Sequence, residues 1–323
     1  MIQSTLNRLG DLVPPDRQYV ITNQTLVDPV AAQLPDLPSA NIVGEPCKRD
    51  TAPCVGLAAA LVGHDDDEAT MVVMPSDHVI NNAGAFRDAI ATGQRLIDQD
   101  PTRIVTFGIR PTYPAESFGY IERDEAMEAV GGSAFGVRQF REKPNRTTAE
   151  NYLKSGGFYW NSGIFMWRAE LITGALAKHE PEMHGHLAKI ADSIGKASFP
   201  DVLETEFSAI QGTSIDYAVM ERHENVVVVE APFPWDDLGS WQSLQRLHEQ
   251  DDHGNTVVGR HVGIDTSGTI IHCDPDHLIA TIDVHDLIVV QTPTATLVAS
   301  KESEERVREV VSELNNRGLH DLL

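Results

Sequence analysis

Apolar and polar positions alternate between two periods along the first part of the chain. Short runs of β character occur at residues 19–22, 70–74 and 103–107, and helical spacing lies between them at residues 53–62 and 86–97. The run at 70–74 is continuous, which predicts a buried strand of the parallel kind. This strand–helix alternation predicts an α/β domain with a parallel sheet and helices on both of its faces.

The helix predicted at 53–62 has Asp50 or Thr51 in position to cap it, and an acidic loop follows at 64–68. From 119 to 140 the pattern changes to strands and turns, with Gly131-Gly132 as a turn. Further elements follow along the chain. We expect helices at 147–154, 170–178 and 214–222, and another buried strand at 226–230.

The pattern of apolar and polar positions changes again near residue 251. Short β runs recur at 262–265, 269–272, 278–282, 287–291 and 295–298. Turn residues separate them at intervals of roughly ten, a spacing that favours stacked β rungs or a small β unit. A charged amphipathic helix is expected at 302–314. We therefore predict two domains, residues 1–252 and 253–323.

Composition narrows the functional classes. The chain carries 25 basic and 48 acidic residues, a formal charge of −23, which disfavours binding to nucleic acid or anionic membranes. Phosphate chemistry would then need local basic residues or a metal cation. The three cysteines form no CxxC pair, and the chain shows neither a signal peptide nor a membrane span. A cytoplasmic protein with reduced thiols is the expectation.

Two aspartates follow predicted strands. Asp77 comes directly after the run 70–74, where a carboxylate can hold Mg²⁺ beside phosphates, although capping of the next turn is the slightly favoured local interpretation. Asp237 lies in Trp-Asp-Asp-Leu-Gly-Ser-Trp, close after the strand 226–230. A metal site and a plain turn are equally supported there.

Other segments offer polar groups to a ligand. Glu142 could accept hydrogen bonds from hydroxyl groups and Lys143 could pair with a phosphate, but a solvated strand end is the favoured local alternative. Asn161 and Gly119 could border a polyol or lie in ordinary turns. No GxGxxG, Walker A or GxSxG motif occurs, so covalent nucleophilic catalysis has no support.

Taken together, these segments resemble the bacterial mannose-1-phosphate guanylyltransferases over essentially the whole chain. Seven motifs occur in that family's order: residues 45–53 (EPCKRDTAP), 75–80 (PSDHVI), 118–121 (FGYI), 141–144 (REKP), 160–165 (WNSGIF), 214–221 (SIDYAVME) and 235–241 (WDDLGSW). The resemblance implies a Rossmann-like nucleotide-diphospho-sugar transferase domain with a mostly parallel sheet. A small C-terminal β-helix-like unit would follow it.

The resemblance also implies roles for residues. The family's two magnesium aspartates match Asp77 and Asp237, and the Glu and Lys of its E-K-P motif, which bind sugar hydroxyls and lie near the sugar phosphate, match Glu142 and Lys143. The catalytic set would be Asp77, Asp237 and Lys143. Two further family positions, matched by Gly119 and Asn161, border the sugar, and the family's nucleotide segment is matched by Arg49, Asp50 and Thr51.

Two departures from the family pattern matter. Position 50 is Asp where the family usually has Asn, which adds a negative charge near the expected nucleotide. The family's opening Gly-rich loop, G-G-x-G-x-R-L-x-P with a catalytic Arg, is absent, and residues 1–9 match the helix that follows it. We expect this chain to start late and to turn over very weakly or not at all without that loop.

The reaction implied is transfer of GMP from GTP to mannose-1-phosphate, which gives GDP-mannose and pyrophosphate with Mg²⁺ as the cofactor. Two alternatives stay open: a non-catalytic paralogue that binds a sugar nucleotide or a partner subunit, and a transferase for another sugar-1-phosphate or base. GTP and mannose-1-phosphate are the expected partners, with no nucleic acid and no membrane. Whether the chain forms a homo-oligomer is not decided by the sequence.

Overall fold

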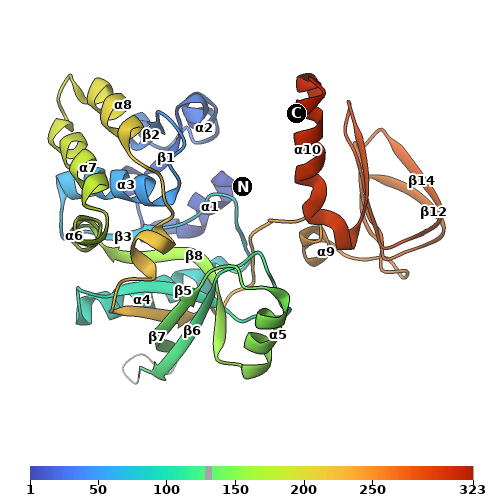
Figure 1. Cartoon of the computed structure of the whole chain (residues 1–323), viewed down its shortest axis with the longest axis horizontal. Helices are drawn as coiled ribbons and strands as arrows, with labels where there is room; N and C mark the ends of the chain where they lie inside the picture. The colour runs from blue at the N-terminus through green and yellow to red at the C-terminus, as the bar shows by residue number, and fades with distance from the viewer. Residues whose placement is uncertain (128–132, 323) are drawn as a thin grey trace. The chain divides into compact units, whose positions relative to one another are not determined.

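The computed structural model describes residues 1–127 and 133–322 (Figure 1). The turn predicted at Gly131-Gly132 lies outside these residues. The chain divides into two compact units, Met1–Trp235 and Asp236–Leu323. The domain boundary that the change to recurring short β runs predicts near residue 252 stays a prediction.

A six-stranded sheet is the centre of the first unit, with the order β3-β8-β5-β9-β7-β6. Its strands are β3 (Thr70–Val73), β5 (Ile104–Ile109), β6 (Tyr120–Ala126), β7 (Ala134–Arg141), β8 (Phe158–Arg168) and β9 (Val226–Glu230). β5 and β9 pair in parallel, and β8 pairs antiparallel with both β3 and β5. Because β7 is antiparallel to β9 and to β6, four strands run one way and β7 and β8 run the other. The expected α/β class, with most strands alike in direction, is confirmed.

The prediction for residues 70–74 is wrong in one respect. β3 is not a buried parallel strand but the edge of the sheet order, paired antiparallel with β8. Its apolar run has another cause, since Val72 packs into the hydrophobic cluster on one face of the sheet and Val73 into the cluster on the other. A strand covered on both faces shows a continuous apolar run whatever the direction of its neighbour.

Helices cover both faces of the sheet, as predicted. On one face lie α3 (Thr51–Asp65), α6 (Ala169–His179), α7 (Pro181–Ser193) and α8 (Phe199–Ala209), and on the other lies α4 (Ala83–Gln99) (Figure 1). Alternate residues of β9 enter the two clusters: Val226 and Val228 one, Val227 and Val229 the other. The sequence pattern did not indicate α7 or α8, and it placed the end of α3 too early.

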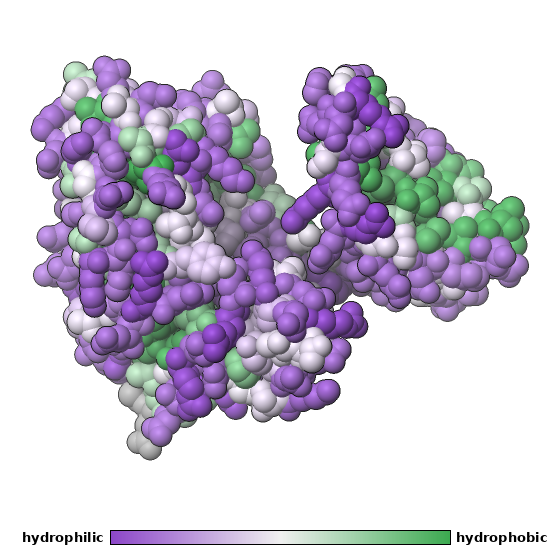
Figure 2. Space-filling view, in the orientation of Figure 1, coloured by the Kyte–Doolittle hydropathy of each residue, from purple (hydrophilic) through white to green (hydrophobic). Residues whose placement is uncertain are grey.

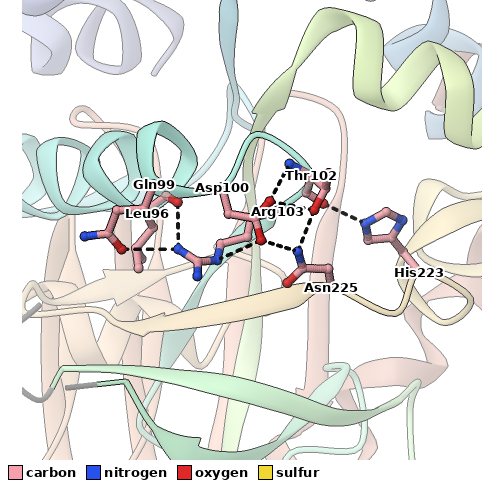
Figure 3. A network of polar contacts seen from close by, with 7 residues as sticks. All are labelled: Leu96, Gln99, Asp100, Thr102, Arg103, His223 and Asn225. Atoms are coloured by element: carbon pink, nitrogen blue, oxygen red, sulfur yellow. Dashed lines mark hydrogen bonds and ion pairs between the residues drawn. The ribbon is translucent and has the colours of Figure 1, made fainter. Parts of the chain in front are cut away.

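A polar network fixes the start of the central parallel pair (Figure 3). One Asp100 carboxylate oxygen accepts from the backbone N–H and hydroxyl of Thr102 at 3.0 and 2.7 Å, and the other accepts from Asn225 at 3.0 Å. These bonds, led by the Thr102 hydroxyl, lower the pKa of Asp100. Asn225 immediately precedes β9, so the network joins the ends of α4, β5 and β9.

Two smaller elements complete the first unit near its N-terminus. β1 (Val20–Asn23) pairs in parallel with β2 (Ile42–Glu45), which confirms the strand predicted at 19–22. α1 (Ile2–Leu9) precedes them, and α2 (Val27–Gln33) lies between them in the chain.

Two further predicted helices can be compared with the structure. α5 (Arg146–Ser155) confirms the helix predicted at 147–154, and the predicted helix at 214–222 is a π-helical turn, η6 (Asp216–Met220).

The second unit is built of stacked β coils. Its strands are β11 (Thr256–Val258), β12 (Arg260–Ser267), β13 (Ile270–His272), β14 (Leu278–His285), β15 (Leu287–Gln291) and β16 (Thr296–Ser300). β12 pairs in parallel with β14, and β13 in parallel with β15, each at an offset of 18 positions. Ile270, Ile288 and Val290 form its small core. The expected rungs are confirmed; the final helix begins as a 3-10 turn, η7 (Lys301–Arg306), and continues as α10 (Val307–Asn316).

The outer face of β12 and β14 is apolar. Figure 2 shows apolar side chains gathered there, and Val262, Ile264, Leu278 and Ile282 are each at least half exposed. No helix among the described residues is both long and apolar enough to cross a membrane.

Candidate functional site

The loop of residues 74–78 joins β3 to β4 (Val79–Ile80), and side chains of α1 hold it. Thr5 Oγ1 donates to the carbonyl of Ser76 at 3.3 Å, and Arg8 donates to the carbonyl of His78 at 3.1 Å. Both α1 side chains belong to residues only 5% exposed. These two hydrogen bonds from α1 fix the backbone of the loop, while the side chain of Asp77 is 74% exposed.

His78 faces Asp77 and is itself oriented by an aromatic ring. Trp235 Nε1 donates to His78 Nδ1 at 3.2 Å, and the two rings meet edge to face. Because an indole nitrogen can only donate, the hydrogen-bond network assigns the imidazole proton to Nε2. That nitrogen lies 3.9 Å from Asp77 Oδ1.

The adjacent aspartates of the second unit have different surroundings. Asp236 is buried, accepts from the backbone N–H of Leu238 at 2.9 Å and forms an ion pair with Arg246. Asp237 is half-buried, and its Oδ1 accepts from the backbone N–H of Gly239 at 3.0 Å. The turn therefore gives Asp236 a structural partner and leaves Asp237 Oδ2 without a hydrogen bond among the described residues.

Four of the sequence-predicted residues meet in the first unit, although they come from three separate motifs. The backbone N–H of Asn161 donates to the carbonyl of Gly119 at 2.8 Å. Lys143 Nζ lies 3.2 Å from Glu142 Oε1, with the Glu142 side chain 22% exposed and that of Lys143 65% exposed. We call this group, Gly119, Glu142, Lys143 and Asn161, the polar cluster.

Gly119 permits the close approach within the polar cluster. A Cβ atom at this position would lie 2.5 Å from Glu142 Oε2 and 3.5 Å from the Cβ of Asn161. A side chain there would displace the Glu142 carboxylate. The glycine in the F-G-Y segment is therefore required for space rather than for an unusual backbone angle.

A further carboxylate, to which the sequence assigned no role, borders the polar cluster. Asn161 Nδ2 donates to Asp216 Oδ1 at 2.9 Å. Burial, followed by the negative charge of Glu142, raises the pKa of Asp216 to about 6. Its only sequence signal is its position within the motif Ser214–Glu221, which assigns it to no particular chemistry.

The predicted nucleotide segment lies at the start of α3. Asp50 caps this helix, accepting from the backbone N–H of Thr51 at 2.9 Å, with a φ of 67° that Asn and Asp adopt more readily than most residues. Arg49 donates to the carbonyl of Ser208, and its buried Nε has no hydrogen-bond partner among the described residues. Thr51 Oγ1 accepts from the backbone N–H of Ile215 at 2.8 Å, which links the segment to η6.

The structure thus brings together Gly119, Glu142, Lys143 and Asn161, and it connects residues 49–51 to the same region through Ile215. The two predicted metal ligands, Asp77 and Asp237, belong to different units. Within the described part of the chain, no group of three or more His, Cys, Asp or Glu side chains is arranged to hold a metal ion.

Family models account for nearly all of the sequence. Residues 1–254 match the model described as Nucleotidyl transferase, and residues 259–314 match the MannoseP isomerase/GMP-like beta-helix domain. The chain belongs to the nucleotidyl transferase family. Over 96% of this chain, the sequence is 36% identical to the mannose-1-phosphate guanylyltransferase of Klebsiella pneumoniae. Over 99% of this chain, it is 37% identical to mannose-1-phosphate guanylyltransferase ManC of Salmonella typhimurium.

The nucleotidyl transferase chain spans 66% of the length of the Klebsiella relative and 67% of the Salmonella one. Among solved structures, it is similar to mannose-1-phosphate geranyltransferase from Thermus thermophilus, with a TM-score of 0.85 and 33% identity over 97% of this chain and 89% of the other. A structure of mannose-6-phosphate isomerase from Helicobacter pylori is also similar, with a TM-score of 0.62 and 27% identity over 73% and 90% of the two chains.

Proposed function

We propose that this chain has the activity of a mannose-1-phosphate guanylyltransferase. One observation carries the proposal furthest: Gly119, Glu142, Lys143 and Asn161, which the family resemblance assigns to the sugar phosphate, meet in one polar cluster. The cluster offers a carboxylate and an amide to sugar hydroxyls and an exposed ammonium group to a phosphate. The names of the relatives agree with this chemistry.

The chemistry of the proposed reaction fits these groups. An oxygen of the sugar phosphate would attack the α-phosphorus of GTP, forming an O–P bond as the bond to pyrophosphate breaks. Because the attacking oxygen is already an anion, no general base is needed, and positioning does most of the work. Glu142 and Asn161 would hold the sugar, and Lys143 would offset the charge of its phosphate.

Mg²⁺ is the cofactor we propose, with Asp77 and Asp237 as its ligands. Both carboxylates present hard oxygen donors, since Asp77 is exposed and Asp237 keeps Oδ2 outside its bond to Gly239. The bound cation would neutralise negative charge on the phosphates. We also propose a cytoplasmic location for the protein.

The test is pyrophosphate release with GTP, ATP, UTP and dTTP, each combined with several sugar-1-phosphates. We expect GTP with mannose-1-phosphate to give the highest rate, and that rate should require Mg²⁺. If turnover is too slow to measure, calorimetric binding of GDP-mannose and mannose-1-phosphate decides the same question. A preference for dTTP or UTP with glucose-1-phosphate would overturn the mannose assignment, and binding without any turnover would favour a non-catalytic paralogue.

A further inference from the structure

The motif Ser214–Glu221 forms η6, a single π-helical turn shortly before β9. Ala218, Val219 and Met220 are at most 1% exposed and anchor the turn in the core. Asp216 is its first residue. π-helical turns interrupt regular structure and often occur at functional sites. The turn therefore holds a half-buried carboxylate beside the polar cluster, on a backbone anchored by buried apolar side chains.

The contacts of Asn161 fix the orientation of its side-chain amide. Asn161 Oδ1 accepts from the backbone N–H of Gly163 at 3.2 Å, while Nδ2 donates to Asp216 Oδ1 at 2.9 Å. Turning the amide over would set its oxygen against the carboxylate and its NH₂ against the Gly163 N–H. One N–H of Nδ2 is left for a ligand, so Asn161 presents a hydrogen-bond donor to it.

Asp216 is held as a carboxylate under unfavourable conditions. Among the described residues, no Lys, Arg or His lies within ion-pair distance of it, whereas the charges of Glu142 and Glu221 both act against its ionisation. Burial is the largest cause of its raised pKa. An uncharged side chain of the same shape would relieve this repulsion, so the charge is not explained by packing.

Resting on the proposed function, we propose that Asp216 is a positioning residue of the sugar-phosphate site, which holds the Asn161 amide with one N–H directed at a sugar hydroxyl. Asp216 acts through Asn161 and need not touch the substrate. The backbone N–H of its neighbour Ile215 donates a hydrogen bond to Thr51 Oγ1, so η6 also connects Asp216 to the predicted nucleotide segment.

Three variants test the proposal. Asp216→Ala removes the acceptor, Asp216→Asn keeps an acceptor of the same shape without the charge, and Glu221→Gln is the control, since it keeps the backbone hydrogen bond from Glu221 to the Asp216 carbonyl and removes only the charge that acts on Asp216. We expect Asp216→Ala to weaken mannose-1-phosphate binding about 10- to 100-fold, as expected for loss of an oriented, charge-assisted contact. GTP affinity should stay within about twofold, Asp216→Asn should lie in between, and Glu221→Gln should bind normally.

A merely structural role predicts a different pattern, with both ligands weakened together and with lower melting temperatures. For a positioning role, Asp216→Asn should melt no lower than the natural protein at pH 7.5 while still binding the sugar phosphate more weakly. Unchanged binding by Asp216→Ala, or equal weakening of both ligands, would overturn the proposal.

A ligand-free measurement separates this proposal from the proposed function. In ¹⁵N-Asn-labelled protein, the two side-chain amide proton signals of Asn161 should be widely split and should collapse towards ordinary values in Asp216→Ala. Unchanged signals would overturn the positioning role. If the natural chain binds no mannose-1-phosphate, the proposed function fails, while the amide signals still decide whether Asp216 orients Asn161.

Discussion

Thr51 Oγ1 accepts a hydrogen bond from the backbone N–H of Ile215 at 2.8 Å, across 164 positions of sequence. Ile215 is 2% exposed, so its N–H has little access to water once the bond is lost. The contact ties the start of α3 to η6, and through η6 to Asp216. A side chain predicted from the family pattern to lie near a nucleotide thus also has a structural task.

Thr51→Val should lower the free energy of unfolding by about 1–2 kcal/mol, because a buried donor is left without a partner. Thr51→Ser keeps the hydroxyl and should stay within about 0.5 kcal/mol of the natural protein. Urea denaturation measures both. Equal stabilities of the Val and Ser variants would show that the hydroxyl does not matter.

Gly119→Ala should weaken sugar-phosphate binding by about tenfold or more without unfolding the protein. The new Cβ would lie 2.5 Å from Glu142 Oε2, and this flexible carboxylate can move aside only by leaving its place in the polar cluster. Gly157→Ala is the matched control, since a Cβ there meets no atom within 4 Å. Calorimetric titration with mannose-1-phosphate compares them, and equal affinities would contradict the crowding.

Asp216 should make stability depend on pH. Its pKa is raised from an ordinary 3.8 to about 6, so between these values the folded chain holds a proton that the unfolded chain has lost. Stability therefore falls as pH rises through this window, and the penalty at pH 7.5 is about 1–3 kcal/mol. The charges that act on Asp216 are those of Glu142 and Glu221.

Asp216→Asn cannot ionise, so its advantage over the natural protein should be about 1–3 kcal/mol larger at pH 7.5 than at pH 4. Chemical denaturation at the two pH values provides the comparison, and subtraction of the two proteins removes the contributions of other titrating groups. The same difference at both pH values would show that the pKa of Asp216 is not raised.

The adjacent aspartates should separate stability from metal dependence. Asp236→Asn breaks the ion pair of a buried carboxylate with Arg246 and should cost about 1–3 kcal/mol, less than a fully buried pair because the Arg246 side chain is 38% exposed. Asp237→Asn keeps an acceptor for the Gly239 N–H and should stay within about 0.5 kcal/mol.

Mg²⁺-dependent binding or turnover should be lost in Asp237→Asn and kept in a folded Asp236→Asn. Asp77→Asn should behave like Asp237→Asn, since Asp77 makes no structural hydrogen bond among the described residues. Near-normal Mg²⁺ dependence in either Asp77→Asn or Asp237→Asn would contradict the assignment of that aspartate as a Mg²⁺ ligand.

Tyr159→Phe should lower the free energy of unfolding by about 1–3 kcal/mol. The phenol is buried and donates to Glu230 Oε2 at 2.6 Å, which joins β8 to the end of β9. Burial, then the bond to Glu230, raises the pKa of Tyr159 to about 12, so stability should also fall as pH rises from about 10 towards 12. Tyr217→Phe is the control, at a phenol in a residue 48% exposed.

The sequence was informative where local pattern and packing agree. The helical spacing from Phe86 to Ile97 predicts α4 because one stripe of that helix is buried, and the runs near 270 and 288 predict stacked strands because each places apolar residues in the same small core. Capping chemistry narrowed the cap of α3 to Asp50 or Thr51, and the structure shows Asp50 in that position. These are local rules, and they were confirmed.

Long-range relationships were not accessible in that way. Whether β3 is parallel or antiparallel depends on which strand pairs with it, and residues 70–74 do not specify that neighbour. Gly119, Glu142 and Asn161 meet because β6 pairs with β7 on one side and with β8 on the other. Only the family pattern could group these residues from the sequence. Asp216 went unassigned because its importance lies in one bond to Asn161, 55 positions away.

The coils of the second unit set a rule for length as well as for residue type. Facing residues lie 18 positions apart where β12 pairs with β14 and β13 with β15, but 14 positions apart where β11 pairs with β13, as Thr256 and Ile270 do. Loss of a single residue within a coil would turn its outward side chains, Ile264 among them, into the core and bring its inward ones to the surface. The offsets of 14 and 18 show that connections of different length already join stacked strands, so insertions or deletions should survive in the turns of this part of the gene and fail within the paired strands.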